Sequence, residues 1–298
     1  MATPLVTVAM SVHNGVSTVV SAIRSIQWQT FSDWELLLVN DASTDETGTV
    51  VRLIHDPRIR VIDERQRKGL ATRLNQCVGE ARGKYVARMD ADDVAYPERF
   101  ERQVRFLQTH PDVDLLGHGA IVIKGQGEVV GLYPTACSHE AICGRPWWGF
   151  PLAHPTWMGK QSWFAGHPYN ESSTKGQDQE LLLQTFRSSQ FAALPEILMG
   201  YRMDKISAVK STRGRFAYCR LLLRQVHDGT SLLTAIKGLG IHGAALARDI
   251  VLDLTGTMRQ DVRRSFGPVD EPIANQWRAV WSRLCAEQGH SGSKRIIA

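Results

Sequence analysis

The first 110 residues alternate between short apolar runs and amphipathic stretches, and this alternation limits the chain to few folds. The apolar runs at residues 5–12, 34–40, 59–63 and 85–89 have the length of buried β-strands. The segments at residues 17–29, 43–54, 69–81 and 97–109 have helical character. Strands that alternate with helices form a mainly parallel sheet covered on both faces. We therefore expect an α/β fold with a Rossmann-like sheet flanked by helices.

Two local signals mark the starts of predicted helices. Ser43 and Glu46 have the spacing of a capping box, which predicts a helix that continues to Ile54. Pro97 is expected in the first turn of the helix that ends near Thr109.

Length and cysteine content bound the class of protein. The 298 residues are enough for one large or two ordinary domains. The five cysteines are odd in number and include no CxxC pair, so we interpret them as reduced thiols of a cytoplasmic protein. The first ten residues lack a basic stretch, and the uncharged run Gly238–Ala247 is about half the ~20 residues that span a bilayer. We therefore expect neither a signal peptide nor a transmembrane helix.

The net charge of +5 is unevenly distributed along the chain. Residues 1–204 carry 20 Lys and Arg against 23 Asp and Glu, whereas residues 205–298 carry 15 against 7. A basic last third indicates a surface that faces something anionic. Two interpretations of the last third stay open. It makes peripheral contact with the inner face of an anionic membrane, or it forms a helical cap packed on the rest of the protein. We expect no nucleic-acid partner, because no recognition motif accompanies the basic residues.

Polar residues follow each predicted strand, and ligands of parallel sheets bind beyond the carboxyl ends of the strands. They are His13 to Gly15, Asp41, residues 65–69, and the three carboxylates Asp90, Asp92 and Asp93. Carboxylates this close repel one another unless a cation lies among them. The set suits a nucleoside diphosphate bridged through Mg²⁺ or Mn²⁺. A dehydrogenase is not expected, because "SVHNGVS" lacks the GxGxxG pattern.

Five stretches occur in the order that is characteristic of one family. They are "VTVAMSVHNG", "LLLVNDASTDET", "RKGLATRLNQCVGEARGKYVARMDADDVAYPERFERQVRFL", "HPTWM" and "GQDQELLLQTFRSSQFAALPEILMGYR". Over about residues 4–204 the chain resembles family 2 glycosyltransferases with the GT-A fold. The resemblance implies a nucleotide-sugar-binding half at residues 1–118 and an acceptor-binding half at 119–204. Residues 205–298 lie outside the resemblance, and their helical patterns and charge predict a basic helical C-terminal extension.

The resemblance implies roles for the acidic triplet. Asp90 and Asp92 match the DxD motif, in which the first carboxylate approaches the ribose and the metal and the last binds the Mn²⁺ or Mg²⁺ on the diphosphate. Asp93 is a further candidate ligand. The alternative is a structural role, in which these carboxylates cap the following helix.

The resemblance also implies contacts with the nucleotide. Asp41 matches the acidic residue that contacts the base, and Val12 and Asn14 match the turn beside that base. Lys68 lies where the family often has a basic group. Two alternatives stay open: Asp41 stabilises the N-terminus of a helix, and Lys68 is a solvated loop charge.

Asp178 matches the family's catalytic base. Many members have Glu-Asp where this chain has Gln177 and Asp178. Glu180 is therefore a competing base, and a helix N-cap is a structural alternative for Asp178. Only one base is needed for a single displacement that inverts the anomeric carbon.

The segment Arg145–Phe164 contains four of the eight tryptophans among glycines and prolines. It lies where the family has its acceptor side, so Trp147, Trp148 and His154 are acceptor-site candidates. Core packing is the alternative for the tryptophans, and a turn is the alternative for His154.

These expectations combine into one functional prediction. The chain is expected to be a metal-dependent inverting glycosyltransferase that moves a sugar from a nucleoside diphosphate donor, UDP by family habit. The acceptor is expected to be a glycan or lipid-linked molecule in envelope or exopolysaccharide biosynthesis. The alternative is a catalytically inactive nucleotide-binding relative that acts as a binding subunit.

Overall fold

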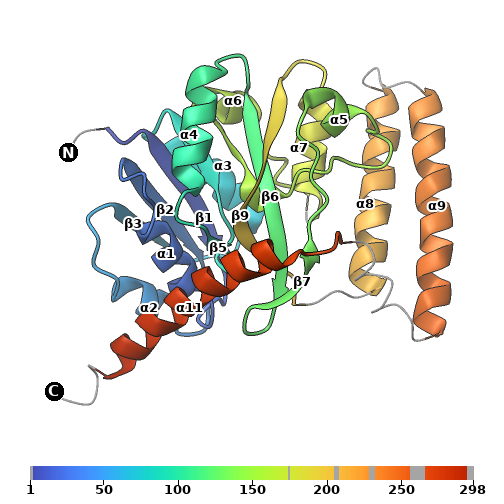
Figure 1. Ribbon diagram of the computed structural model, residues 1–298. Helices are drawn as coiled ribbons and strands as arrows, with labels where there is room; N and C mark the ends of the chain where they lie inside the picture. Colours follow the sequence, from blue (N-terminus) through green and yellow to red (C-terminus); the bar gives the residue numbers. More distant parts are fainter. Residues whose placement is uncertain (1–2, 174, 205–207, 228–231, 256–265, 294–298) are drawn as a thin grey trace.

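One sheet runs through the molecule with helices on both faces, as the alternation predicts. Figure 1 shows a computed structural model, which describes residues 3–173, 175–204, 208–227, 232–255 and 266–293. The sheet has nine strands in the order β3-β2-β1-β4-β8-β6-β9-β5, and β7 pairs with β6.

The first half of the sheet is parallel. Strand β1 pairs with β2 and β4, and β2 pairs with β3. The β1 and β2 side chains are almost all buried, because helices cover both faces there. The carboxyl ends of these strands therefore meet at one edge. The strands are β1 (Val6–Val12), β2 (Trp34–Asp41), β3 (Ile59–Glu64) and β4 (Tyr85–Arg88).

The second half of the sheet is mixed. Strand β8 is antiparallel to β4 and β6, β5 is antiparallel to β9, and β6 runs parallel to β9. The predicted domain boundary at residue 118 falls inside β6, so the two predicted halves share one continuous sheet. The strands are β5 (Val94–Ala95), β6 (Leu115–Lys124), β7 (Glu128–Leu132), β8 (Met158–Lys160) and β9 (Phe191–Arg202).

The helices bury apolar faces on opposite sides of the sheet. Helices α1, α2 and α4 contribute to one core cluster, and α3, α6 and α7 contribute to the other. Their bounds are α1 (Val19–Gln27), α2 (Thr47–Arg52), α3 (Leu70–Glu80), α4 (Arg99–Thr109), α5 (His139–Cys143), α6 (Gln161–Gly166) and α7 (Gln177–Thr185), with a 3₁₀ turn at His154–Thr156.

The predicted capping box is wrong. Helix α2 begins at Thr47, and its N-cap Glu46 makes no side-chain cap. The Ser43 hydroxyl accepts the backbone N–H of Asn14 at 3.0 Å, so it joins the turns after β1 and β2. The capping-box spacing was misleading because the Ser43 side chain bonds to the turn after β1 and not to the first turn of α2. Pro97 likewise lies just before α4, which begins at Arg99.

The C-terminal extension is helical and has two separate parts. Helices α8 (Ala208–His227) and α9 (Leu232–Leu254) lie side by side and form a hairpin next to α7 (Figure 1). Helix α11 (Glu271–Ser293) returns to the sheet and crosses it near β5 and α1. Within the described part of the chain, no helix has the length and apolarity needed to cross a membrane.

Helix α11 is held by two tryptophans that fit against glycines. The Trp277 indole, 1% exposed, donates to the Gly127 carbonyl at 2.8 Å. A Cβ on Gly200 would lie 2.4 Å from the Trp277 ring, and a Cβ on Gly127 would lie 2.5 Å from the Trp281 ring. Any larger residue at either position would push α11 away from the sheet. One face of this helix therefore belongs to the hydrophobic core on this side of the sheet.

Candidate active site

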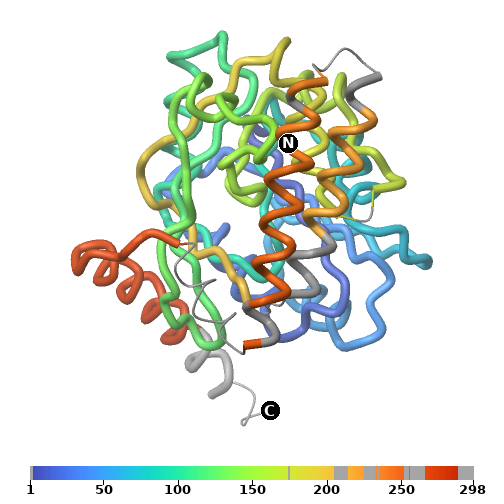
Figure 2. Tube along the Cα trace, turned by 90° about the vertical axis from the view of Figure 1, so that its right-hand side faces the viewer, coloured from blue at the N-terminus to red at the C-terminus, as the bar shows by residue number. Residues whose placement is uncertain are grey.

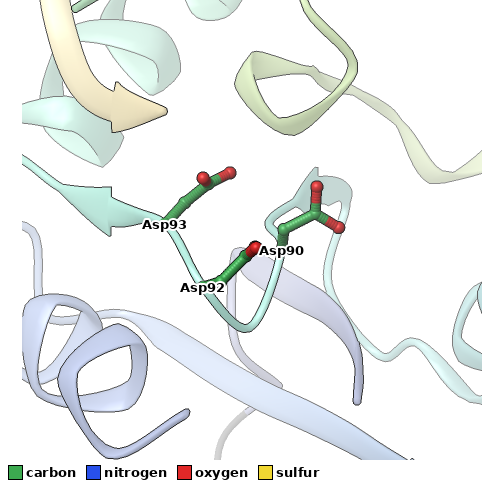
Figure 3. Close-up of side chains that lie close together, drawn as sticks. All are labelled: Asp90, Asp92 and Asp93. Carbon is green, nitrogen blue, oxygen red and sulfur yellow. The ribbon is translucent and has the colours of Figure 1, made fainter. Parts of the chain in front are cut away.

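The carboxylates of Asp90, Asp92 and Asp93 lie together in the loop that connects β4 to β5 (Figure 3). One oxygen from each lies within 4.8 Å of the others. Arg88 forms a bidentate pair with Asp90: its Nη1 donates to Oδ2 at 2.8 Å and its Nη2 donates to Oδ1. Asp93 Oδ1 accepts the backbone N–H of Arg202 at 2.8 Å. These bonds hold the carboxylates in place and do not neutralise all three.

The electrostatics of the triplet favour a divalent cation. Burial, followed by the charge of Asp90, raises the pKa of Asp92 to about 6. The same two causes raise the pKa of Asp93 well above its usual value. Asp93 Oδ2 is buried and has no hydrogen-bond partner among the described residues. Closely spaced carboxylate oxygens are the ligands of Mg²⁺ and Mn²⁺, so the residues present fit such an ion.

The turns after β1 and β2 are tied to each other. Asn14, with a φ of 53°, accepts the Thr44 backbone N–H at 2.8 Å through Oδ1. Its neighbour Val12 is buried at the end of β1. Asn14 is exposed and Val12 is 4% exposed, so at this edge Asn14 is the side chain that is accessible to a ligand.

Asp41 is committed to the loop that follows β3. Its carboxylate accepts the backbone N–H groups of Lys68 at 2.9 Å and Gly69 at 2.8 Å and the Nε of Arg73 at 2.7 Å. Burial opposes ionisation, but these bonds, led by that from Lys68, hold the pKa of Asp41 below its usual value. Asp41 thereby fixes the backbone around Lys68, and any contact with a base must use its remaining lone pair.

Asp178 and Glu180 have different surroundings on α7. Glu180 is 5% exposed, and its carboxylate accepts Asn170 Nδ2 at 2.9 Å and the Ser173 hydroxyl. Asp178 lies in the first turn of α7, where Gly176 is the N-cap. Asp178 lines a pocket of about 1120 Å³, and burial raises its pKa. Asp178 is therefore accessible from the pocket, whereas the carboxylate of Glu180 is occupied by side chains of the preceding loop.

The pocket lies between the loop before residue 151, the start of α7, and the α8–α9 hairpin. Trp148, 51% exposed, forms part of its wall and stacks on His242 of α9 at 5.8 Å between ring centroids. Trp147 is partly exposed, and Lys237 Nζ lies 5.3 Å from its ring centroid. The lining includes Asp178 and none of the three carboxylates of the β4–β5 loop.

His154 belongs to the interior. It is 8% exposed, and its Nε2 is 2.9 Å from the Tyr169 hydroxyl. Its ring packs edge-on against Trp157. Burial, together with the charge of Arg88, holds the pKa of His154 well below its usual value. These contacts account for His154 without a ligand.

Sequence reasoning did not single out two arginines at the centre of the site. Arg88, two residues before Asp90, forms a bidentate pair with Asp90. Its charge also partly opposes the rise that burial causes in the pKa values of Asp92 and Asp178. Arg202 of β9 donates its Nε to the Asp92 carbonyl at 2.9 Å. The apolar strand around Arg88 gave a weak signal, since a cation in such a run needs a partner. Arg202 gave no signal.

Comparisons with known proteins agree with this architecture. S. aureus TarS 1–349 in complex with UDP-GlcNAc has a TM-score of 0.62 at 14% identity, over 94% of this chain and 80% of that one. The mannosyltransferase PcManGT from Pyrobaculum calidifontis, in complex with GDP-Man and Mn²⁺, has a TM-score of 0.59 at 18% identity, over 96% and 86%. The fold is therefore that of the GT-A glycosyltransferases, and the predicted fold class is confirmed.

Sequence comparison gives the family. Residues 7–164, more than half of the chain, match the family described as glycosyl transferase family 2. The putative glycosyltransferase EpsE of Bacillus subtilis is 35% identical over 162 residues, which are 53% of this chain and 57% of EpsE. The match thus spans little more than half of that relative. This chain belongs to glycosyl transferase family 2, which confirms the predicted resemblance.

Proposed function

We propose that the protein is a metal-dependent inverting glycosyltransferase that uses a nucleoside diphosphate sugar. The observation that carries the proposal is the carboxylate triplet, in which Asp93 Oδ2 is buried without a partner among the described residues while Asp92 has a raised pKa. Asp92 and Asp90 would hold Mn²⁺ or Mg²⁺, with Asp93 beside them. A bound divalent cation supplies positive charge for the departing diphosphate.

The remaining steps fall to residues of the chain. We propose that Val12, Asn14 and Asp41 border the base, with Lys68 beside the nucleotide and Asp90 near the ribose. The acceptor hydroxyl attacks the anomeric carbon as the bond from that carbon to the diphosphate oxygen breaks, and Asp178 takes the hydroxyl proton as general base. A single displacement inverts the configuration. Glu180, whose carboxylate is occupied by Asn170 and Ser173, is not the base in this proposal.

The acceptor side of the proposal rests on the pocket that contains Asp178. An exposed indole such as Trp148 offers a flat apolar surface for a sugar ring, and Trp147 lies next to it. We propose a glycan or lipid-linked acceptor, in envelope or exopolysaccharide biosynthesis. A lipid-linked acceptor requires peripheral contact with a membrane.

The donor nucleotide is proposed to be UDP. The complex of TarS with UDP-GlcNAc favours uracil as the nucleobase of the donor. The complex of PcManGT with GDP-Man makes guanine the competing nucleobase. Titration with UDP and with GDP decides between the two bases.

Calorimetric titration of UDP, with Mn²⁺ and then with EDTA, tests the donor site. We expect binding that requires the metal, followed by release of UDP from a UDP-sugar when an acceptor is supplied. Binding without any turnover across a panel of acceptors would favour an inactive binding subunit. Failure of UDP, GDP and dTDP to bind in either condition would contradict the proposal.

A further inference from the structure

The α8–α9 hairpin carries most of the exposed large hydrophobic side chains of the described surface. Seven of the eleven such side chains lie on these two helices, with exposed fractions from 52 to 68%. Scattered exposed apolar residues are ordinary, but a concentration on one element marks an interaction site. They are Phe216 and Leu223 on α8 and Leu232, Leu233, Ile236, Ile250 and Val251 on α9.

The spacing places these side chains on the outer side of each helix. On α9 the exposed positions recur every three or four residues from Leu232 to Val251, and the positions between the large residues are filled by Gly240, Gly243, Ala244 and Ala247. This stripe is about 28 Å long at 1.5 Å per residue. On α8, Phe216 and Leu223 are two turns apart on one face. We call these positions together the outer face of the hairpin.

The charges on the outer face are positive. Residues 208–254 contain seven Lys and Arg against three Asp and no Glu. Arg220 and Arg224 are exposed beside Leu223. Lys237 is exposed beside Ile236 at the margin of this face, where its Nζ also lies 5.3 Å from the Trp147 ring centroid. Asp249 is 2% exposed and pairs with Arg215 at 2.9 Å, on the inner side. Among the side chains described on α8 and α9, none that is exposed is acidic.

The outer face is not covered by another described segment. Figure 2 looks at the hairpin from outside, with α9 in front and α8 beside it, and helix α11 lies away from it at the lower left of this view. The inner side of the hairpin packs on α7 and lines the pocket through Tyr218, Leu221 and His242. One side of the hairpin therefore serves the catalytic domain and the other is open.

We propose that the outer face of the α8–α9 hairpin binds the surface of an anionic lipid leaflet. Exposed aliphatic side chains enter the acyl boundary, while arginines and lysines at its edge meet lipid phosphates. The inference rests on the proposed function, because it gives a lipid-linked acceptor a direct route to the pocket on the inner side of the same hairpin. It also assigns the two parts of the extension different roles, since α11 packs one face against the sheet through Trp277, Val280 and Leu284.

A second copy of the chain is the competing occupant. An isologous contact would bring two cationic outer faces together without carboxylates to pair with Arg220, Arg224 and Lys237. Like charges at an interface are unfavourable, whereas anionic phosphates complement all three cations. Charge thus favours the leaflet over self-association.

Co-sedimentation of the full-length protein with lipid vesicles tests the proposal. Phosphatidylcholine vesicles with phosphatidylglycerol should bind the protein, and vesicles without it should bind at least tenfold more weakly. Arg220→Glu with Arg224→Glu should lower binding by at least tenfold, because each basic residue near the surface contributes about a fivefold effect. Phe216→Ser with Ile236→Ser should also lower binding without lowering the melting temperature, since both side chains are over half exposed.

Matched substitutions elsewhere control for general effects. Leu53→Ser removes a side chain that is 54% exposed after α2, and Arg105→Glu reverses a charge on α4 that is 66% exposed. Neither should change vesicle binding. Equal binding to both vesicle types, unchanged binding of the hairpin variants, or a dimer in light scattering without vesicle binding would each overturn the proposal. Vesicle binding with no UDP binding would keep this surface and reject the proposed activity, so the two failures are distinguishable.

Discussion

Arg88 donates to both carboxylate oxygens of Asp90 from a side chain that is only 4% exposed. This fork fixes the first acidic residue of the triplet at the end of β4. We expect Arg88→Lys, which keeps the charge and loses the fork, to weaken Mn²⁺-dependent UDP binding about tenfold. Calorimetry measures the affinity. Arg105→Lys, on an exposed i,i+4 pair, is the control that should leave it unchanged. Equal affinities for all three proteins would show that Arg88 does not position Asp90.

Asp92→Asn should abolish metal-dependent UDP binding and leave the fold intact. The carboxylate repels Asp90, so its removal relieves repulsion while it removes a metal ligand. Thermal melting without metal should therefore be unchanged or slightly higher. Asp112→Asn, at an exposed surface position, should behave like the unmodified protein in both measurements. Retention of Mn²⁺-dependent binding by Asp92→Asn would exclude Asp92 as a ligand.

Asp178→Asn and Glu180→Gln should separate the two candidate bases. We expect Asp178→Asn to bind UDP normally and lose transfer by about 10²–10⁴-fold, the usual contribution of a general base. Glu180→Gln should keep most of the transfer rate and lose stability, about 1 kcal/mol, because its hydrogen bonds to Asn170 and Ser173 become weaker. The opposite result for transfer would make Glu180 the base.

The pH dependence of transfer should report the raised pKa of Asp178. A general base acts in its deprotonated form, so kcat/KM should fall as the pH drops through the pKa of Asp178. Burial raises that pKa, which moves the fall to a higher pH than an ordinary aspartate would give. The pH profile with saturating metal measures it. A profile in which kcat/KM rises toward acid pH would contradict this role.

Trp148→Ala should raise the KM for the acceptor about tenfold and leave the Kd for UDP unchanged. The indole is half exposed on the pocket wall, and its stacking contact is with His242, so its removal leaves the core intact. Steady-state kinetics with varied acceptor measures the effect. A changed UDP affinity with an unchanged acceptor KM would place Trp148 on the donor side.

Trp277→Ala should lower the free energy of unfolding by about 3–5 kcal/mol, because its buried ring fills the space between α11 and the sheet. Gly200→Ala should cost about 1–3 kcal/mol, since the added Cβ meets that ring. Gly79→Ala in α3 is the matched control: a Cβ there meets nothing within 4 Å, so stability should rise. Chemical denaturation measures all three. A neutral Gly200→Ala would show that α11 is loosely held.

The elements that the sequence predicted well are those with their own local pattern. The four parallel strands and their helices appear within a few residues of the expected bounds, because strands buried on both faces are continuous apolar runs. Strand β5, with two residues, and β8, with three, are too short to carry a pattern. The docking of α11 was also not predictable. It requires glycines at positions 127 and 200, which lie far from α11 in the sequence and leave room for its tryptophans.

The clustering of the three carboxylates and the position of Asp178 at the start of a helix follow from the sequence, whereas the surroundings of these residues do not. The sequence left Asp178 and Glu180 as alternatives. The structure gives them different surroundings, because Asp178 lines the pocket whereas Glu180 accepts bonds from Asn170 and Ser173. Similarly, Asp41 has an acidic side chain in the expected place, but three donors that lie 27 to 32 residues further along the chain occupy it. Long-range pairing of this kind leaves no trace in local spacing.

The route of α11 has a consequence for the order in which the protein matures during synthesis. Arg202 holds the Asp92 carbonyl, and its guanidinium lies 5.9 Å from the Trp281 ring centroid. The four parallel strands and the carboxylate loop lie within residues 6–93, so they are synthesised long before α11. The carboxylate loop gains its last support only when residue 281 has left the ribosome. A nascent chain that already contains Asp90, Asp92 and Asp93 would therefore still lack the finished scaffold around them.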